Sequence, residues 1–495
     1  MLVELLIQYG PMFVILFLFT LIITRYFRRR EEPPGPICLP FLGYLPLLYS
    51  SRPLGDHLNH LAKRYGPLFQ VQKGETTHIV LNSHAVIKEA YKRLEFSIRP
   101  QSTLNKIFQE AGEDMLVFAN GDKWRQSRKI AQHALGLFSS SRNAQLQANV
   151  HKCLGWLIAK WSNQAGQPVV TKPDLMSCTG ATIASLCFGS QADPSDKFLA
   201  TLSHYNEDFF GRLAAGLWLT DPFPSLEPLF RSQIKGAIQS YGRFVDYINE
   251  KLQSYQPNTD VRTIADSLCK AGEELSTEAH GASEYDIRRI GIEIYDAGFF
   301  TTAENLEWLL ATMAGHPDFQ QQLHQELDSC VPTGELPSLD RDWDRLHFAR
   351  ACVTEVLRWV TNLNVGLPRC LEQDVEFLGC RLRKGSYIIS NLWAANNDPD
   401  RFESPRKFDP TRFIAPDGTF DRVKSEYLLS FSCGKRRCPG ESIAKQQLFL
   451  LFTGIMQSFK IEVAPENADL KFLDGIDSAT LVSVAPHKLI FSRRK

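Results

Sequence analysis

The run Phe431-Ser432-Cys433-Gly434-Lys435-Arg436-Arg437-Cys438-Pro439-Gly440 decides the fold. It reads F-x-x-G-x-R-x-C-x-G, and a helical pattern follows it from Glu441 through Phe452. Glycines allow tight backbone turns around the second cysteine. Nearby basic residues and the helix N-terminus favour a thiolate at Cys438 over a thiol. The run therefore predicts a loop that presents one cysteine thiolate as a ligand; the alternative is a basic loop with a buried cysteine.

This loop resembles the haem-binding loop of the cytochromes P-450, a family in which a cysteine thiolate is the axial ligand of the haem iron. The resemblance covers essentially all of residues 33–495. It implies a cytochrome P-450 fold, mainly α with small peripheral β-sheets, and haem b (iron protoporphyrin IX) as cofactor. It also implies that Cys438 binds the iron and that the loop contacts the haem through Phe431, Gly434 and Gly440.

The composition favours one large body. The 495 residues are 44% hydrophobic and 22% charged, with no internal linker or repeat. The formal net charge is +0, so we expect no nucleic-acid partner. The 11 cysteines are scattered without a C-x-x-C pair, which argues against a zinc site or a disulfide scaffold and fits a reducing, cytosol-facing body. The alternative to a free Cys438 ligand is a disulfide between Cys433 and Cys438.

The N-terminus predicts a membrane anchor. Residues 5–24 are nearly all apolar, and 20 helical residues span roughly 30 Å, the thickness of a bilayer core. Arg25 and the arginines at 28–30 follow, which places that flank in the cytosol. A cleaved signal peptide would carry its charge on the other side. We expect a transmembrane anchor at 1–27, a basic, proline-rich hinge at 28–45 and a haem-thiolate catalytic domain at 46–495. The resemblance to microsomal members implies a single-pass protein of the endoplasmic reticulum membrane with its catalytic domain on the cytosolic side.

Helices dominate the predicted body. Apolar residues recur at helical spacing, and short alternating runs read as strands near 68–72, 78–81 and 375–390 and in a C-terminal hairpin strand at 480–492. The predicted helices are 57–65, 84–93, 122–136, 141–165, 172–188, 195–214, 229–254, 259–271, 284–315, 317–330, 346–360 and 438–458.

A second motif supports the cysteine loop. Glu355 and Arg358 stand at i and i+3, so they share a helix face and can pair. Alone, E-x-x-R is a common surface ion pair. Downstream, the stretch 405–413 resembles the family's P-x-x-F-x-P-x-R-F segment. The resemblance implies that Arg412 completes a buried Glu–Arg–Arg network that fixes the loop bearing Cys438.

Four residues are candidates to bind the haem propionates. Trp124 and Arg128 lie at i and i+4, on one helix face, and an indole N–H and a guanidinium are suitable donors for carboxylates. Such a pair is common on amphipathic helices. The resemblance implies that both, together with Arg369 and Arg436, contact the propionates.

The helix predicted at 284–315 carries Ala297-Gly298-Phe299-Phe300-Thr301-Thr302, which resembles the family's A-G-x-(D/E)-T-(T/S). The resemblance implies that Gly298 lets oxygen approach the helix and that Thr301 relays protons, with Thr302 beside it. The alternative is that these residues only kink a helix. Phe300 replaces the usual acid and has no titratable group. Protons would then pass through the threonines and water, or from Glu304 one turn later.

The resemblance implies a monooxygenase that inserts one oxygen atom from O2 into a small hydrophobic substrate such as a sterol, fatty acid, terpenoid or foreign compound. Electrons would come from NADPH through a flavin reductase, with a cytochrome b-type protein as a second donor. Basic residues near the loop are candidates to bind the reductase; these are Lys123, Lys129, Lys435, Arg436 and Arg437.

Several stretches, 96–100 among them, resemble the microsomal drug- and steroid-oxidising branch. The residues expected to line the substrate pocket are Phe299, Phe300, Val365 and Leu481. Two other functions stay open. Phe300 is compatible with a haem-thiolate isomerase or dehydratase that needs little proton relay, and a non-catalytic haem-based ligand sensor is the third possibility.

Overall fold

The computed structural model describes residues 31–39, 41–49, 53–111, 116–138, 143–189, 193–214, 219–253, 263–276, 284–477 and 481–494. The predicted transmembrane anchor at 1–27 lies outside these residues. Within them, no helix is both long enough and apolar enough to cross a membrane.

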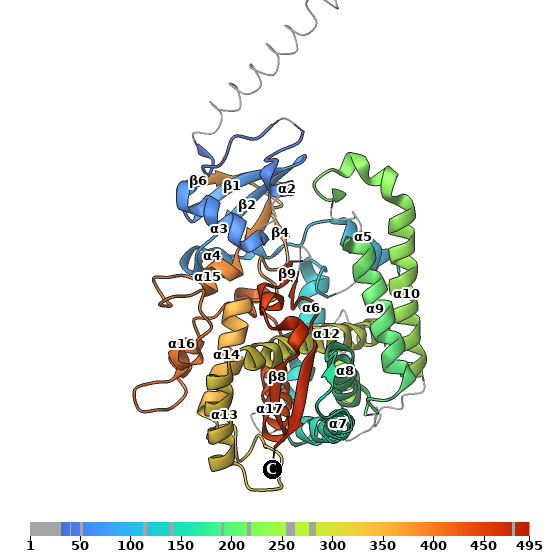
Figure 1. Ribbon diagram of the computed structural model, residues 1–495. Coiled ribbons are helices and arrows are strands. Elements are labelled where there is room, and N and C mark those ends of the chain that lie inside the picture. The colour runs from blue at the N-terminus through green and yellow to red at the C-terminus, as the bar shows by residue number, and fades with distance from the viewer. Residues whose placement is uncertain are drawn as a thin grey trace, which may run out of the picture.

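Helices make up most of the body (Figure 1). They are α2 (Pro46–Tyr49), α3 (Leu54–Tyr65), α4 (His84–Lys92), α5 (Thr103–Glu110), α6 (Gly121–Leu137), α7 (Ala144–Ser162), α8 (Lys172–Phe188), α9 (Lys197–Ala214), α10 (Arg231–Gln253), α11 (Ile264–Ser276), α12 (Glu284–Gly315), α13 (Pro317–Cys330), α14 (His347–Val360), α15 (Leu392–Asn396), α16 (Arg422–Ser425) and α17 (Glu441–Ser458). The mainly helical prediction is confirmed, although α5 was not expected as a helix.

The strands form small sheets, and the four-stranded sheet lies to one side of most of the helices (Figure 1). A four-stranded sheet has the order β1 (Leu68–Lys73), β2 (Thr76–Leu81), β7 (Tyr387–Ser390), β4 (Arg369–Cys370). β2 and β7 are parallel, which pairs His78 with Tyr387 across some 300 positions of sequence. A second sheet has the order β3 (Pro168–Val169), β11 (Leu489–Arg493), β8 (Phe459–Val463), and two hairpins join β5 (Val375–Phe377) to β6 (Cys380–Leu382) and β9 (Ile476–Asp477) to β10 (Val482–Ser483).

α12 crosses the centre of the molecule, where other elements cover its apolar side chains on several sides. Most of its residues from Arg289 to Met313 are buried. It packs chiefly against α8, and also against α11, α14 and α17 (Figure 1). A helix that is apolar almost all round belongs in the core of a large protein. The helices packed around α12 therefore fix its position.

The segment predicted as a hinge lies against the four-stranded sheet. Gln70 N–H donates to the Pro34 carbonyl (2.8 Å), and Tyr44 N–H donates to the Gln72 carbonyl (2.7 Å). A side chain on Gly35 would collide with the Gln70 carbonyl, since its Cβ would lie 1.9 Å from that oxygen. Pro34, Gly35 and Tyr44 are therefore held against β1.

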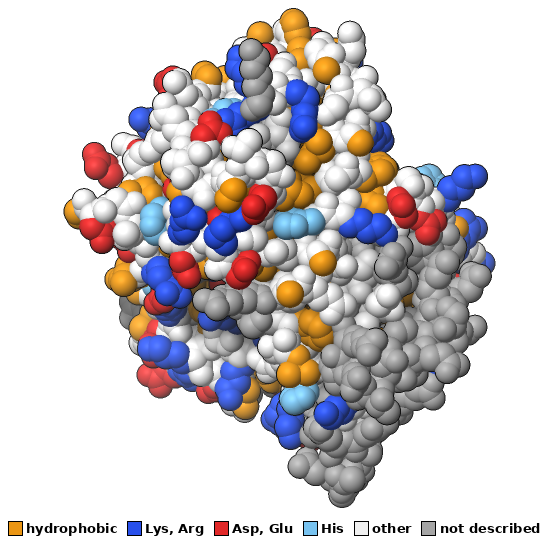
Figure 2. All heavy atoms as spheres, turned by 90° about the horizontal axis from the view of Figure 1, so that it is seen from below, with side chains coloured by type: hydrophobic (Ala, Val, Ile, Leu, Met, Phe, Trp, Pro, Cys, Tyr) orange, Lys and Arg blue, Asp and Glu red, His pale blue; other side chains and the backbone are white. Residues whose placement is uncertain are grey.

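The surface carries both signs of charge. Figure 2 shows one face, on which Lys and Arg side chains alternate with Asp and Glu and with scattered apolar groups. This mixture agrees with the equal totals of 55 basic and 55 acidic residues. Any electrostatic attraction of a partner must therefore be local.

Candidate active site

The cysteine loop is held by its own backbone. Cys438 N–H donates to the Phe431 carbonyl (3.0 Å), and Arg437 N–H donates to the Gly434 carbonyl (3.1 Å). Gly434 has φ +71°, and a Cβ there would lie 2.2 Å from the Tyr91 carbonyl oxygen. Only glycine suits both the conformation and the contact. The loop leads into α17, with Gly440 as the residue before its first turn.

Cys438 borders a cavity of about 860 Å³, together with Trp124, Arg128 and Gly434. Its side chain is accessible from this cavity but is otherwise surrounded by protein, and this burial raises the pKa of the Cys438 thiol. The Gly440 N–H, Arg128 and Arg437 act in the opposite direction and lower the pKa, as the sequence predicts. Their effect on the pKa is smaller than that of burial, and a cation bound at the sulfur would lower the pKa further.

The thiol forms no disulfide. All eleven cysteines lie in described segments, and all are free. The competing Cys433–Cys438 disulfide is therefore absent. Cys433 is half-buried, and burial raises the pKa of its thiol.

Three arginines are buried beside the loop without a carboxylate partner among the residues described. They are Arg99, Arg369 and Arg436, with exposed fractions of 5%, 2% and 8%. Arg436 donates to the carbonyls of Ser97 (2.9 Å) and Ala119 (2.6 Å) and lies over the Trp124 ring at 4.0 Å. Burial and the neighbouring guanidiniums lower the pKa of both Arg99 and Arg436. We call these three residues the arginine cluster.

The arginine cluster fits a dianion. Arg369 lies 3.2 Å above the Tyr91 ring centroid and donates to the Phe96 carbonyl (3.0 Å), but its Nε has no hydrogen-bond partner. Nε of Arg128 is also buried and unpartnered, and Arg128 otherwise donates to the Arg437 carbonyl. Buried charges are normally paired. Two carboxylates, such as the propionates of haem, would supply the missing charge beside the cysteine ligand, so these residues fit haem.

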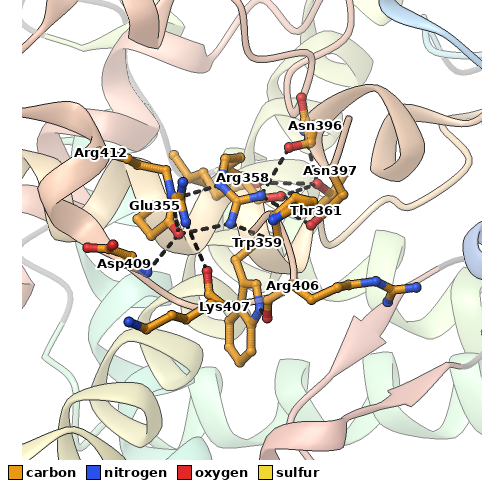
Figure 3. Close-up of polar contacts among 12 residues, drawn as sticks. Glu355, Arg358, Trp359, Thr361, Asn396, Asn397, Arg406, Lys407, Asp409 and Arg412 are labelled. Atoms are coloured by element: carbon orange, nitrogen blue, oxygen red, sulfur yellow. Dashed lines mark hydrogen bonds and ion pairs between the residues drawn. The ribbon is translucent and has the colours of Figure 1, made fainter. Parts of the chain in front are cut away.

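The predicted Glu–Arg–Arg network is complete (Figure 3). The Glu355 carboxylate accepts from Arg358 Nε (2.7 Å) and Nη2 (2.8 Å) and from Arg412 Nε (3.0 Å). It also accepts from Asp409 N–H (2.9 Å). The remaining donors of Arg358 reach the carbonyls of Asn396 and Pro405. Ser430, just before the cysteine loop, donates to the carbonyl of Leu357 (2.7 Å), which connects the helix of this network to the loop.

Thr301 and Thr302 both lie on α12, as the sequence predicts, and they differ in exposure. The Thr301 hydroxyl donates to the Ala297 carbonyl, and the Thr302 hydroxyl donates to the Gly298 carbonyl, both at 2.8 Å. Thr302 is 2% exposed, whereas Ala297 is exposed and Thr301 is half-buried. Ala297 and Thr301 therefore form the open stripe of this helix.

Gly298 has a packing role that the sequence analysis did not expect. A Cβ on Gly298 would point at Ile183 of α8, at 3.4 Å. The glycine thus allows α8 and α12 to approach closely, and the interpretation that it opens the helix to oxygen finds no support in this packing.

The predicted substrate-pocket residues do not gather around Cys438, and none of them lines the cavity described above. Phe299 is 1% exposed and stacks on Tyr295 at 5.2 Å, which places it in the core between α8 and α12. Val365 packs with Phe69 and Val80 beneath the four-stranded sheet. Leu481 is buried, and Phe300 is half-buried.

Two functional features escaped the sequence analysis. Arg99 belongs to the arginine cluster, and its only signal in the sequence is an arginine between Ile98 and Pro100. Lys172 at the start of α8 contacts the carboxylate of Glu304. Residues so far apart in sequence show no common pattern.

A helical body with a cysteine loop beside unpaired buried arginines is typical of proteins that bind haem through a thiolate. The family model described as "Cytochrome P450" matches residues 33–491. The chain therefore belongs to the cytochrome P450 family, as predicted, and is a monooxygenase with haem b as its cofactor.

Similar proteins span nearly the whole chain. The chain is 28% identical to cytochrome P450 2H2 of Gallus gallus over 94% of both proteins. It is 29% identical to cytochrome P450 2D14 of Bos taurus over 97% of both, and 27% identical to cytochrome P450 2C44 of Mus musculus over 89% of both.

Proposed function

We propose that this monooxygenase inserts one oxygen atom from O2 into a small hydrophobic substrate, using electrons from NADPH delivered by a flavin reductase. The observation that carries the proposal is the position of Cys438 at a cavity next to the arginine cluster. A ligand thiolate and a site for two carboxylates lie side by side there. Haem, when bound, supplies oxygen activation that is favoured by its thiolate ligand.

The chain itself binds, orients and supplies protons. Cys438 holds the iron from the loop that the Glu355 network fixes, and Arg128, Arg369 and Arg436 orient the propionates. Thr301 carries the hydroxyl on the open stripe of α12, where it can pass a proton between water and the reacting oxygen. The sterol, steroid, fatty acid, terpenoid and foreign-compound classes all suit an apolar pocket, and we propose that this pocket lies along the open stripe of α12 near Phe300.

The reductase is proposed to bind at the surface around the cysteine loop. Lys435 and Arg437 are exposed there, as are Lys123 and Lys129 on α6. Arg436 is buried in the arginine cluster and is therefore removed from this set. Basic side chains beside the ligand loop can steer an acidic donor, whether a flavin reductase or a cytochrome b-type protein.

The membrane arrangement is also a proposal. An anchor at 1–27 and a basic, proline-rich hinge would attach the catalytic domain to the cytosolic side of the endoplasmic reticulum membrane. The contacts of Pro34 and Tyr44 with β1 support a defined tilt of the domain on the membrane.

Phe300 favours a second candidate function, a haem-thiolate isomerase or dehydratase. Such a reaction needs no acid at this position, because oxygen is rearranged within the substrate and no protons are consumed.

Product analysis under ¹⁸O₂ gas tests the proposal. The full-length protein would be combined with reductase, NADPH and a lipid extract. We expect one labelled oxygen atom in the product. An unlabelled product would establish the isomerase or dehydratase, and NADPH consumption that does not rise on adding reductase would support the ligand sensor.

A further inference from the structure

A buried charge cluster lies beside the position where the acid is missing. Nζ of Lys172 contacts the carboxylate of Glu304 and lies 3.9 Å from Oε2 of Glu307. The same nitrogen lies 5.9 Å from the ring centroid of Phe300. Phe300, Glu304 and Glu307 occupy successive turns on one face of α12, so this face of the helix meets a single ammonium group from α8.

The cluster contains more acid than base. The Glu304 and Glu307 side chains are 1% and 7% exposed, whereas the Lys172 side chain is 31% exposed and reaches water. Burial raises the pKa of Glu307 to about 8; Lys172 lowers this pKa and Glu304 raises it. His487 also faces the group, and burial lowers the pKa of His487, with Lys172 lowering it further. Glu307 therefore retains its proton at neutral pH.

Stability does not explain this arrangement. Buried ion pairs are often no better for stability than apolar side chains of similar volume, because desolvation offsets the attraction. Apart from the contact with Lys172, the oxygens of Glu304 have no hydrogen-bond partner among the residues described. A buried carboxyl with a raised pKa, such as Glu307, is a common feature of functional sites.

The cluster is close to the reacting side of the helix. Glu304 lies three residues after Thr301, and side chains at this spacing are neighbours on a helix surface. Thr301 lies on the open stripe, and Lys172 lies at the solvent end of the cluster. Lys172 thus links solvent to the two acids, and Glu304 lies one helical turn from Thr301.

We infer that Glu304 replaces the acid missing at Phe300 and supplies protons to the Thr301 hydroxyl, with Glu307 and Lys172 restoring them. The inference rests on the proposed oxygen chemistry, which consumes two electrons from NADPH and two protons for each O2 and gives one water. Glu304 releases a proton through water at Thr301 and recovers one from Glu307 or from solvent beside Lys172. This relay breaks and forms only O–H bonds at the acids and water and N–H bonds at Lys172, so Glu304 is a positioning and proton-supplying residue.

The test is Glu304→Gln in the full-length, haem-loaded protein, with the double variant F300E/E304Q as the matched rescue. We expect Glu304→Gln to lower product formed per NADPH at least 10-fold, with the electrons recovered as peroxide, and to change the solvent deuterium effect. The double variant should restore at least half of the yield. Without turnover, the infrared band of a protonated carboxyl should disappear near pH 8 in the wild type and at lower pH in Glu304→Gln, because Glu307 loses a neighbouring charge.

Unchanged product yield and solvent deuterium effect in Glu304→Gln would overturn the inference and leave a structural ion pair. If Glu304→Gln does not load haem, Lys172→Met replaces it; this variant keeps both acids and should slow proton recovery, and normal product yield in it would equally overturn the relay. Labelled product from the wild type establishes the proposed function independently, so the failure of one is distinguishable from the failure of the other.

Discussion

The Glu355 network and the arginine cluster are two buried groups of charge that differ in completeness. In the network, a carboxylate lies between two guanidiniums, and four hydrogen bonds reach its two oxygens (Figure 3). In the arginine cluster, three guanidiniums repel one another and use backbone carbonyls as acceptors. The network needs nothing from outside the chain, whereas the cluster needs an anion. The cations of the structural group are thus paired with a carboxylate of the chain, whereas the cations of the binding site have no carboxylate partner among the described residues.

The largest effect should come from breaking the complete network. Glu355→Gln strands Arg358, which is fully buried, and we expect a loss of about 3–5 kcal/mol of unfolding free energy. Urea unfolding followed by circular dichroism measures it. The matched control is Glu89→Gln, which removes the exposed pair with Lys92 and should cost less than about 1 kcal/mol. Equal losses in the two variants would contradict the role given to burial.

The sequence predicts those parts of the two charge groups whose residues lie close together in the chain. The E-x-x-R pair and the cysteine loop are short motifs, and most helices show a short hydrophobic period. The sequence therefore predicts Glu355, Arg358 and Cys438. It does not predict pairing across distant segments, as in the parallel alignment of β2 with β7 or the contact of Lys172 with Glu304. Apolar residues near a motif were interpreted as pocket lining, but Phe299 and Val365 face the core, since a sequence gives no direction for a side chain at the boundary between core and site.

The second-largest effect should come from the arginine cluster, and it should appear in haem binding and not in stability. Arg436→Met removes one of several like charges, so the haem-free protein should lose little stability. Haem binding should weaken roughly 10- to 100-fold, because a charge-assisted hydrogen bond is worth about 1.5–3 kcal/mol. Haem transfer to apomyoglobin measures the affinity, and urea unfolding of the haem-free protein measures the stability. A large loss of stability with unchanged haem affinity would make Arg436 part of a structural network instead.

A third buried charge group, Lys172 with Glu304 and Glu307, has more acid than base, and a pH titration tests its protonation. The pKa of Glu307 is raised from 4.5 to about 8, so between these values the folded protein keeps a proton that the unfolded chain has lost. The contribution of Glu307 to the unfolding free energy therefore falls as pH rises through this window, by at most about 1.4 kcal/mol per pH unit. Glu307→Gln should flatten this slope in urea unfolding at pH 5, 6, 7 and 8. Asp296, with a pKa of about 7, has the same sign and leaves part of the slope in the variant. A slope identical to that of the wild type would show that Glu307 is ionised in the folded protein throughout.

The smallest effect should come from a charge that is neither buried nor enclosed. Arg437 is exposed and pairs with Glu441 at 2.7 Å, and such surface pairs contribute about 0–1 kcal/mol. Arg437→Gln should therefore leave both unfolding and the haem spectrum nearly unchanged. If the surface around the loop attracts an acidic reductase, the variant should instead slow association a few-fold at low salt, and the difference should vanish at high salt because screening removes steering. Stopped-flow reduction over a salt series measures this. A rate loss that persists at every salt concentration would indicate a contact role for Arg437, because steering is the part of an interaction that salt removes, whereas a packed contact remains.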